Sequence, residues 1–175
     1  MPGQRLNLQK RFDEWDPTRC EILMAQAKKN HQPVNRSLKL KEGSMNNEPF
    51  ILIVDDDPDI LEGITTILET RTYRLATARD GERCLEMLAE QTPDLLILDL
   101  LMPRLDGWGV IREMRSEPRY AKIPIMVLTT VIEDASRRRY ELETGMAMDV
   151  QDYIQKPTRP ADLIRRVENL LKSNA

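Results

Sequence analysis

The chain has 175 residues, of which 41% are hydrophobic and 31% are charged, an ordinary balance for a globular protein. Lysine and arginine number 26 against 29 acidic residues, and the resulting net charge of −3 argues against a protein built mainly to coat nucleic acid or an anionic membrane. Two cysteines and one histidine are too few for a disulfide framework or a four-ligand zinc site. The sequence shows no signal peptide and no apolar run long enough to span a membrane, so we expect a cytoplasmic protein.

The composition changes near residue 48. Residues 1–48 hold nine Lys or Arg against six Asp or Glu, a local charge of +3, which leaves −6 for the remainder. Apolar residues are scattered in this part, as they are in segments that do not fold alone. The pattern allows a short helix near 17–29, with an apolar stripe made of Cys20, Leu23, Met24 and Ala27. We expect residues 1–48 to form a poorly ordered N-terminal extension.

From Pro49 onward, short apolar runs alternate with amphipathic stretches. The apolar runs predict strands over 50–54, 74–79, 95–98, 123–128 and 153–154. Helical spacing predicts helices over 60–68, 84–90, 110–114, 135–144 and 160–172. Asp57 is the expected N-cap of the first helix, and Gly145 ends the fourth. Five β-α units in a row predict an α/β fold, a single doubly wound five-stranded parallel sheet with helices on both faces, over residues 49–175.

Polar residues stand at the carboxyl ends of four of these strands, where open α/β sheets place their sites. They are Asp55 and Asp56 after the first strand, Asp99 after the third, Thr129 after the fourth and Lys156 after the fifth. Each has a common structural explanation by itself, such as a helix cap or a turn, but together they form a consistent set. Three converging carboxylates need a cation, and oxygen ligands favour Mg²⁺. With a lysine and a hydroxyl nearby, the pattern predicts a site for a phosphoryl group on one aspartate.

The motifs that carry these residues resemble those of the receiver domain of bacterial two-component response regulators. They are Val54-Asp55-Asp56-Asp57-Pro58, Leu98-Asp99-Leu100-Leu101-Met102-Pro103, Asp106-Gly107, Thr129 and Lys156-Pro157, and the resemblance covers residues 49–173. It implies a flavodoxin-like sheet with strand order 2-1-3-4-5. The gap between Thr129 and Lys156 is longer than is usual in that family.

The resemblance also implies a role for each site residue. Asp99 is the expected phosphoacceptor, and Mg²⁺ is expected on Asp55, Asp56, Asp99 and the backbone carbonyl of Leu101. Lys156 is expected to pair with a phosphoryl oxygen, and Thr129 to hydrogen-bond the phosphoryl group as a switch residue. Tyr153 matches the aromatic switch position and is expected to turn inward as Thr129 moves. Leu101 and Val131 are apolar where relatives that lose phosphate quickly often carry polar groups, which suggests a long-lived phosphoaspartate.

The expected function is therefore a stand-alone receiver, since the sequence ends just after the last predicted helix. Its phosphodonor is expected to be a sensor histidine kinase or a histidine phosphotransfer protein. Output is expected through the surface of helix 4, strand 5 and helix 5 to a protein partner, with a homodimer left open, and without direct contact to nucleic acid or membrane. Beyond self-phosphorylation and slow self-dephosphorylation we expect no enzymatic activity.

Two alternatives remain at this stage. One is a receiver-like docking module that works without phosphorylation. The other is an aspartate-nucleophile phosphohydrolase of the haloacid dehalogenase type, whose motifs Asp55-x-Asp57, Thr129 and Lys156 superficially match. That family has no acceptor like Asp99 on an intermediate strand, so the second alternative is the weaker one.

Overall fold

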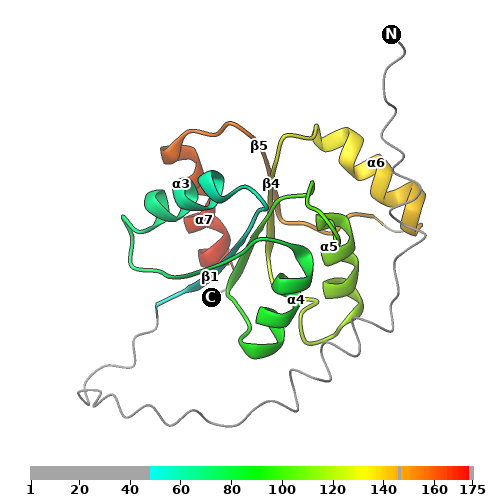
Figure 1. Ribbon diagram of the computed structural model, residues 1–175, viewed down its shortest axis with the longest axis horizontal. Helices are drawn as coiled ribbons and strands as arrows, with labels where there is room; N and C mark the ends of the chain where they lie inside the picture. Colours follow the sequence, from blue (N-terminus) through cyan, green and yellow to red (C-terminus); the bar gives the residue numbers. More distant parts are fainter. Residues whose placement is uncertain (1–47, 146, 174–175) are drawn as a thin grey trace.

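The computed structural model describes residues 48–145 and 147–173 (Figure 1). Its five strands are β1 (Phe50–Val54), β2 (Arg74–Ala78), β3 (Leu95–Leu98), β4 (Ile125–Thr129) and β5 (Asp152–Gln155). The helices within these residues are α3 (Pro58–Leu68), α4 (Gly81–Glu90), α5 (Gly107–Ser116), α6 (Glu133–Thr144) and α7 (Pro160–Ser173). The helix allowed near 17–29 lies outside the described residues.

The strands form one parallel sheet in the order β2-β1-β3-β4-β5. The predicted α/β fold and strand order are thus confirmed. Because neighbouring parallel strands end at the same edge, the carboxyl ends of β1 and β3 lie side by side at the centre of the sheet. This adjacency positions the site described below.

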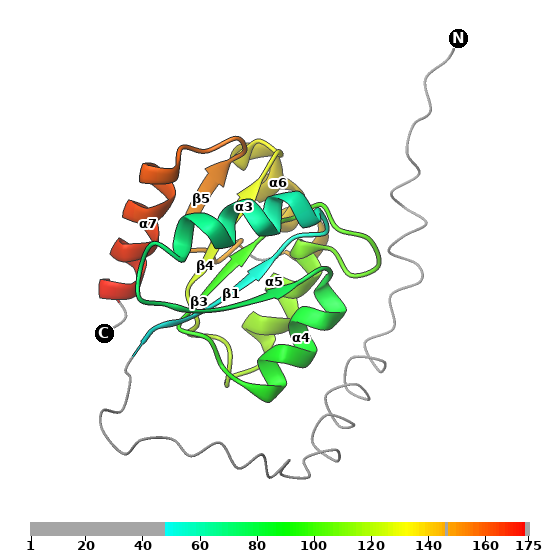
Figure 2. The ribbon, with the colours of Figure 1, turned by 60° about the vertical axis from the view of Figure 1, so that its left-hand side comes forward.

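Helices cover both faces of the sheet, and the pleat of the strands decides which side chains meet which layer. Alternate residues of β1 point to opposite faces: Leu52 and Val54 pack with α4 and α5, whereas Ile51 and Ile53 pack with α3 and α7. Figures 1 and 2 show α3 and α7 together on one side of the sheet, with α4 and α5 on the other. The strand is buried along its whole length, as its unbroken apolar run predicts.

Several elements begin two or three residues away from the predictions: the helices α3, α4, α5 and α6 start earlier, and the strand β4 starts later. Strand β4 begins at Ile125, two residues later than predicted, because the N–H of Ile123 donates to Tyr120 in a turn and Pro124 has no N–H to donate. Helix α6 begins at Glu133, where the side chain of the preceding residue makes no cap hydrogen bond. Asp57 does cap α3 by accepting from the N–H of Asp59 at 2.9 Å.

The long connection from α6 to β5 is anchored by one arginine of α5. The Nε of Arg115 donates to the carbonyl of Asp149 at 3.0 Å, and one of its terminal nitrogens lies 3.2 Å from the Oε1 of Gln151. The same guanidinium donates to the carbonyls of Ala121 and Ile123, both at 3.1 Å. None of the helices in the described part of the chain combines the length and apolar character that a membrane span requires.

Candidate functional site

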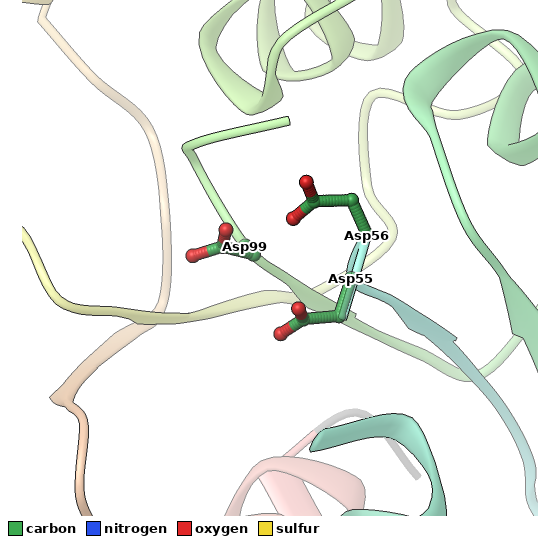
Figure 3. A group of neighbouring side chains, drawn as sticks. All are labelled: Asp55, Asp56 and Asp99. Carbon is green, nitrogen blue, oxygen red and sulfur yellow. The ribbon is translucent and has the colours of Figure 1, made fainter. Parts of the chain in front are cut away.

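Three carboxylates meet where β1 and β3 end. One oxygen of each of Asp55, Asp56 and Asp99 lies within 4.8 Å of the others. Figure 3 shows the three carboxyl groups reaching into the same space from these two neighbouring strand ends. Asp55 and Asp99 are only 2% and 6% exposed, whereas Asp56 is exposed to solvent. The structure therefore brings together the three acidic residues that the sequence singled out.

Backbone N–H groups hold the two buried carboxylates in place. The Oδ1 of Asp55 accepts from the N–H of Asp57 at 3.1 Å, and the Oδ2 of Asp99 accepts from the N–H of Leu101 at 3.1 Å. Each acid is thus fixed by the amide two residues further on, as Asp side chains commonly are in tight turns. These contacts orient the carboxylates without neutralising their charge.

Lys156 supplies the positive charge of the site. Its Nζ contacts the Oδ2 of Asp55 directly and lies 3.5 Å from the Oδ1 of Asp99. The N–H of Lys156 donates to the carbonyl of Thr129 at 2.7 Å, so the end of β4 fixes the start of this segment, and the Lys156–Pro157 peptide is cis. Burial raises the pKa of Asp55, and the hydrogen bond from Lys156 opposes that rise.

The two switch candidates lie on adjacent strands. Thr129 is the last residue of β4, where the sequence had placed it just after the strand, and it is fully buried. Its Oγ1 has no hydrogen-bond partner among the described residues. Tyr153 on β5 is turned inward and is 9% exposed, with its hydroxyl 2.9 Å from the carbonyl of Val131 and 2.8 Å from the Oγ of Ser136.

Ser136 is a buried partner of Tyr153 that sequence reasoning missed. It lies on α6, is fully buried and contacts the hydroxyl of Tyr153. Its signal in the sequence is a polar residue four positions before Tyr140, on the face of the helix that packs inward. Leu101 lies two residues after Asp99 and is 47% exposed. A role for its carbonyl as a metal ligand remains a prediction.

The donor set fits a hard divalent cation. Its donors are carboxylate oxygens, and it has neither the sulfur nor the imidazole ligands that transition metals favour. Three negative charges within 4.8 Å face a single lysine, so the cluster retains net negative charge. The hydroxyl of Thr129, for which the described part of the chain offers no partner, adds a donor for an oxygen-rich ligand.

Comparisons with known proteins agree with this geometry. The family model described as the response regulator receiver domain matches residues 51–168. A probable transcriptional regulator, ycf27 of Cyanophora paradoxa, is 38% identical over 126 residues, which are 72% of this chain and 49% of that protein. The sensor histidine kinase TmoS of Ectopseudomonas mendocina is 37% identical over 72% of this chain and 12% of its own length. The chain spans about half the length of the ycf27 relatives that it matches.

Solved structures show the same likeness. The receiver domain of a signal transduction histidine kinase from Syntrophus aciditrophicus aligns with a TM-score of 0.64 and 32% identity, over 71% of this chain and 91% of that one. The receiver domain of a sensor histidine kinase from Pseudomonas aeruginosa PAO1 aligns with a TM-score of 0.63 and 27% identity, over 71% of this chain and 98% of its own. That structure contains a magnesium ion coordinated in its active site cleft. This chain belongs to the response regulator receiver domain family.

Proposed function

We propose that this chain is a phosphorylation switch in which Asp99 accepts a phosphoryl group from the histidine of a sensor kinase or a phosphotransfer protein. An oxygen of Asp99 forms a bond to phosphorus while the P–N bond breaks, and its electron pair goes to the imidazole nitrogen. The observation that carries the proposal is the burial of Asp99 beside two further carboxylates and Lys156 at the central edge of the sheet. One transfer per chain makes this a switch and not a turnover enzyme.

Mg²⁺ is the cofactor that this site would hold, through Asp55, Asp56 and Asp99 and the carbonyl of Leu101. When bound, the ion supplies positive charge that offsets the negative charge of the phosphoryl oxygens. Lys156 would bind one phosphoryl oxygen, and its contact with Asp55 keeps the ammonium group 3.5 Å from the Oδ1 of Asp99. The Thr129 hydroxyl, which has no partner among the described residues, donates to another phosphoryl oxygen.

The proposed output is a changed surface over α6, β5 and α7, read in the cytoplasm by a separate protein or a second copy of the chain. Tyr153 connects the site to this surface, because its strand leads to Lys156 and its hydroxyl contacts the loop after Thr129. Ile132 and Leu142, at the two ends of α6, are large apolar side chains exposed to solvent. Exposed apolar side chains are compatible with contact to a protein partner, although two that lie ten residues apart do not form a contiguous patch.

The test is the intact mass of the protein after incubation with acetyl phosphate. We expect a single phosphoryl adduct that requires Mg²⁺ and is absent in Asp99→Asn. Asp57→Asn is the matched control, because Asp57 is an exposed acid next to the cluster that caps α3, a role asparagine also fills. An adduct that persists in Asp99→Asn would contradict the proposal. Failure of both acetyl phosphate and beryllofluoride to act on the wild-type protein would favour the docking-module alternative.

We predict that Leu101→Asn shortens the lifetime of the phosphorylated protein severalfold. The side chain of Leu101 is exposed two residues after the acceptor, where an apolar group cannot hydrogen-bond an attacking water. An amide at this position can orient that water. The measurement is the decay of the phosphoryl adduct after the donor is removed. The control is Leu142→Asn, the same change at an exposed leucine near the end of α6, which should leave the decay unchanged. Equal decay in Leu101→Asn and in the wild type would contradict the prediction.

A further inference from the structure

A short chain of hydrogen bonds is buried behind the site. The hydroxyl of Tyr153 donates to the carbonyl of Val131 at 2.9 Å, and the Oγ of Ser136 lies 2.8 Å from the same hydroxyl. A phenol has one proton to donate, and Tyr153 gives it to Val131. Ser136 must therefore be the donor in the second bond, and the chain runs from Ser136 through Tyr153 to Val131.

These three residues belong to three different segments. Tyr153 lies on β5 three residues before Lys156, Val131 lies in the loop two residues after Thr129, and Ser136 is in the first turn of α6. Ser136 is fully buried and Tyr153 nearly so, which means that water does not compete for these bonds. The chain therefore ties the start of α6 to the strand that positions Lys156.

Helix α6 buries little apolar surface, so polar contacts matter to its position. Of its twelve residues only Ser136 and Tyr140 are buried, and the residue before it, Ile132, gives no side-chain cap. Arg139 adds a second anchor by contacting Asp106 at 3.5 Å and lying 3.9 Å from the ring centroid of Trp108. With so little apolar burial, the loss of one buried hydrogen bond is a large change for this helix.

We propose that Ser136 is a positioning residue of the switch, which holds Tyr153 inward before any phosphoryl group arrives. The signalling role of Ser136 rests on the proposed function, whereas its hydrogen bond with Tyr153 does not. Ser136 sets the fraction of unphosphorylated chains in which Tyr153 already points inward. In these chains the Tyr153 hydroxyl joins the loop after Thr129 to the start of α6. A phosphodonor or a protein partner that prefers the inward Tyr153 then encounters a larger fraction of chains that can bind it.

The test is the solvent exposure of Tyr153 in the unphosphorylated full-length protein. Tyrosine labelled with ¹³C gives four ring signals, and Tyr153→Phe assigns the relevant one. A soluble paramagnetic agent broadens the ring that faces solvent. We expect Ser136→Ala to raise the ratio of outward to inward Tyr153 about fivefold, the effect of losing one neutral hydrogen bond. Two control variants should keep the wild-type ratio of outward to inward Tyr153. One is Ser136→Thr, which keeps a hydroxyl, and the other is Ser116→Ala, the same change at an exposed serine of α5.

Amide exchange in α6 supplies a second measurement. Tyr153→Phe removes the same hydrogen bonds from the other side, so it should raise amide exchange at the start of α6 even if Ser136→Ala does not fold. Ser136→Ala should add nothing to exchange in the Tyr153→Phe background. The proposal is overturned if Tyr153 stays as protected in Ser136→Ala as in wild type, or if α6 exchange in Tyr153→Phe equals that of the wild type. Because no phosphodonor is used, failure of Asp99 to accept phosphate would leave these results intact.

Discussion

Replacing Lys156 with methionine is expected to slow the phosphorylation of Asp99 about 100-fold. The same change should lower the free energy of unfolding by about 3 kcal/mol at neutral pH without Mg²⁺. Lys156 Nζ contacts Asp55 and lies 3.5 Å from Asp99, and both acids are almost entirely buried. Without the ammonium group these carboxylates lose the only positive charge that touches them within the described residues. In the proposed transfer, the incoming phosphoryl group would lose a cationic partner at the same time.

The loss of stability in Lys156→Met should be larger at neutral pH than at mildly acidic pH. Burial already raises the pKa of Asp55, and Lys156 opposes that rise, so its removal raises this pKa further. A carboxyl whose pKa is higher in the folded than in the unfolded state favours folding at low pH, and that contribution is lost as the pH rises through the folded-state value. The deficit of Lys156→Met is therefore largest at neutral pH and shrinks as the solution becomes mildly acidic.

Mg²⁺ should reduce the same deficit, because without the Lys156 ammonium beside Asp55 and Asp99 the folded variant should bind the cation more tightly than the wild type, and tighter binding to the folded state stabilises it more. Urea unfolding of wild type and Lys156→Met at neutral and mildly acidic pH, each with and without Mg²⁺, measures both effects. Lys122→Met is the control, since Lys122 is exposed and should change stability by less than about 0.5 kcal/mol. A deficit in Lys156→Met that is the same at both pH values and insensitive to Mg²⁺ would show that the lysine contributes packing and not charge.

The sequence was sufficient to place the acidic cluster because two physical rules act together. The runs 50–54 and 95–98 are apolar throughout, so they predict strands buried on both faces. Each ends directly at aspartate, and the carboxyl ends of parallel neighbours meet at one edge. Asp55, Asp56 and Asp99 are therefore brought together by the backbone alone, before any detail of side-chain packing is known.

Details that depend on tertiary contacts were not predictable in this way. The contact between Ser136 and Tyr153 joins residues 17 positions apart, on a helix whose apolar pattern is weak. The late start of β4 follows from a turn at Ile123 that competes with the strand for backbone hydrogen bonds. Periodicity reports which face of an element is buried, but it does not report which polar group across the core meets a given hydroxyl.

Gly107 is a further residue whose importance only the structure reveals. The motif Asp106-Gly107 indicates a turn, but a Cβ added at Gly107 would lie 2.2 Å from the carbonyl oxygen of Asp99 and 2.7 Å from the Cα of Leu100. These are backbone atoms of the segment that carries Asp99, and they cannot rotate away as a flexible side chain can. The N–H of Gly107 also donates to the carbonyl of Leu100 at 3.1 Å, which fixes the close approach.

Gly107→Ala is therefore expected to lower the free energy of unfolding by about 3 kcal/mol, at the upper end for an overpacked site. It should also reduce phosphorylation, because relief of the clash moves Asp99. Gly63→Ala makes the same chemical change in the exposed interior of α3, where nothing lies within 4 Å of the added Cβ. There alanine should raise stability by about 0.5–1 kcal/mol, since it favours the helix more than glycine does. Urea unfolding of the two variants should thus give shifts of opposite sign. A Gly107→Ala protein as stable as the wild type would mean that α5 can move away from the end of β3 without a loss of stability.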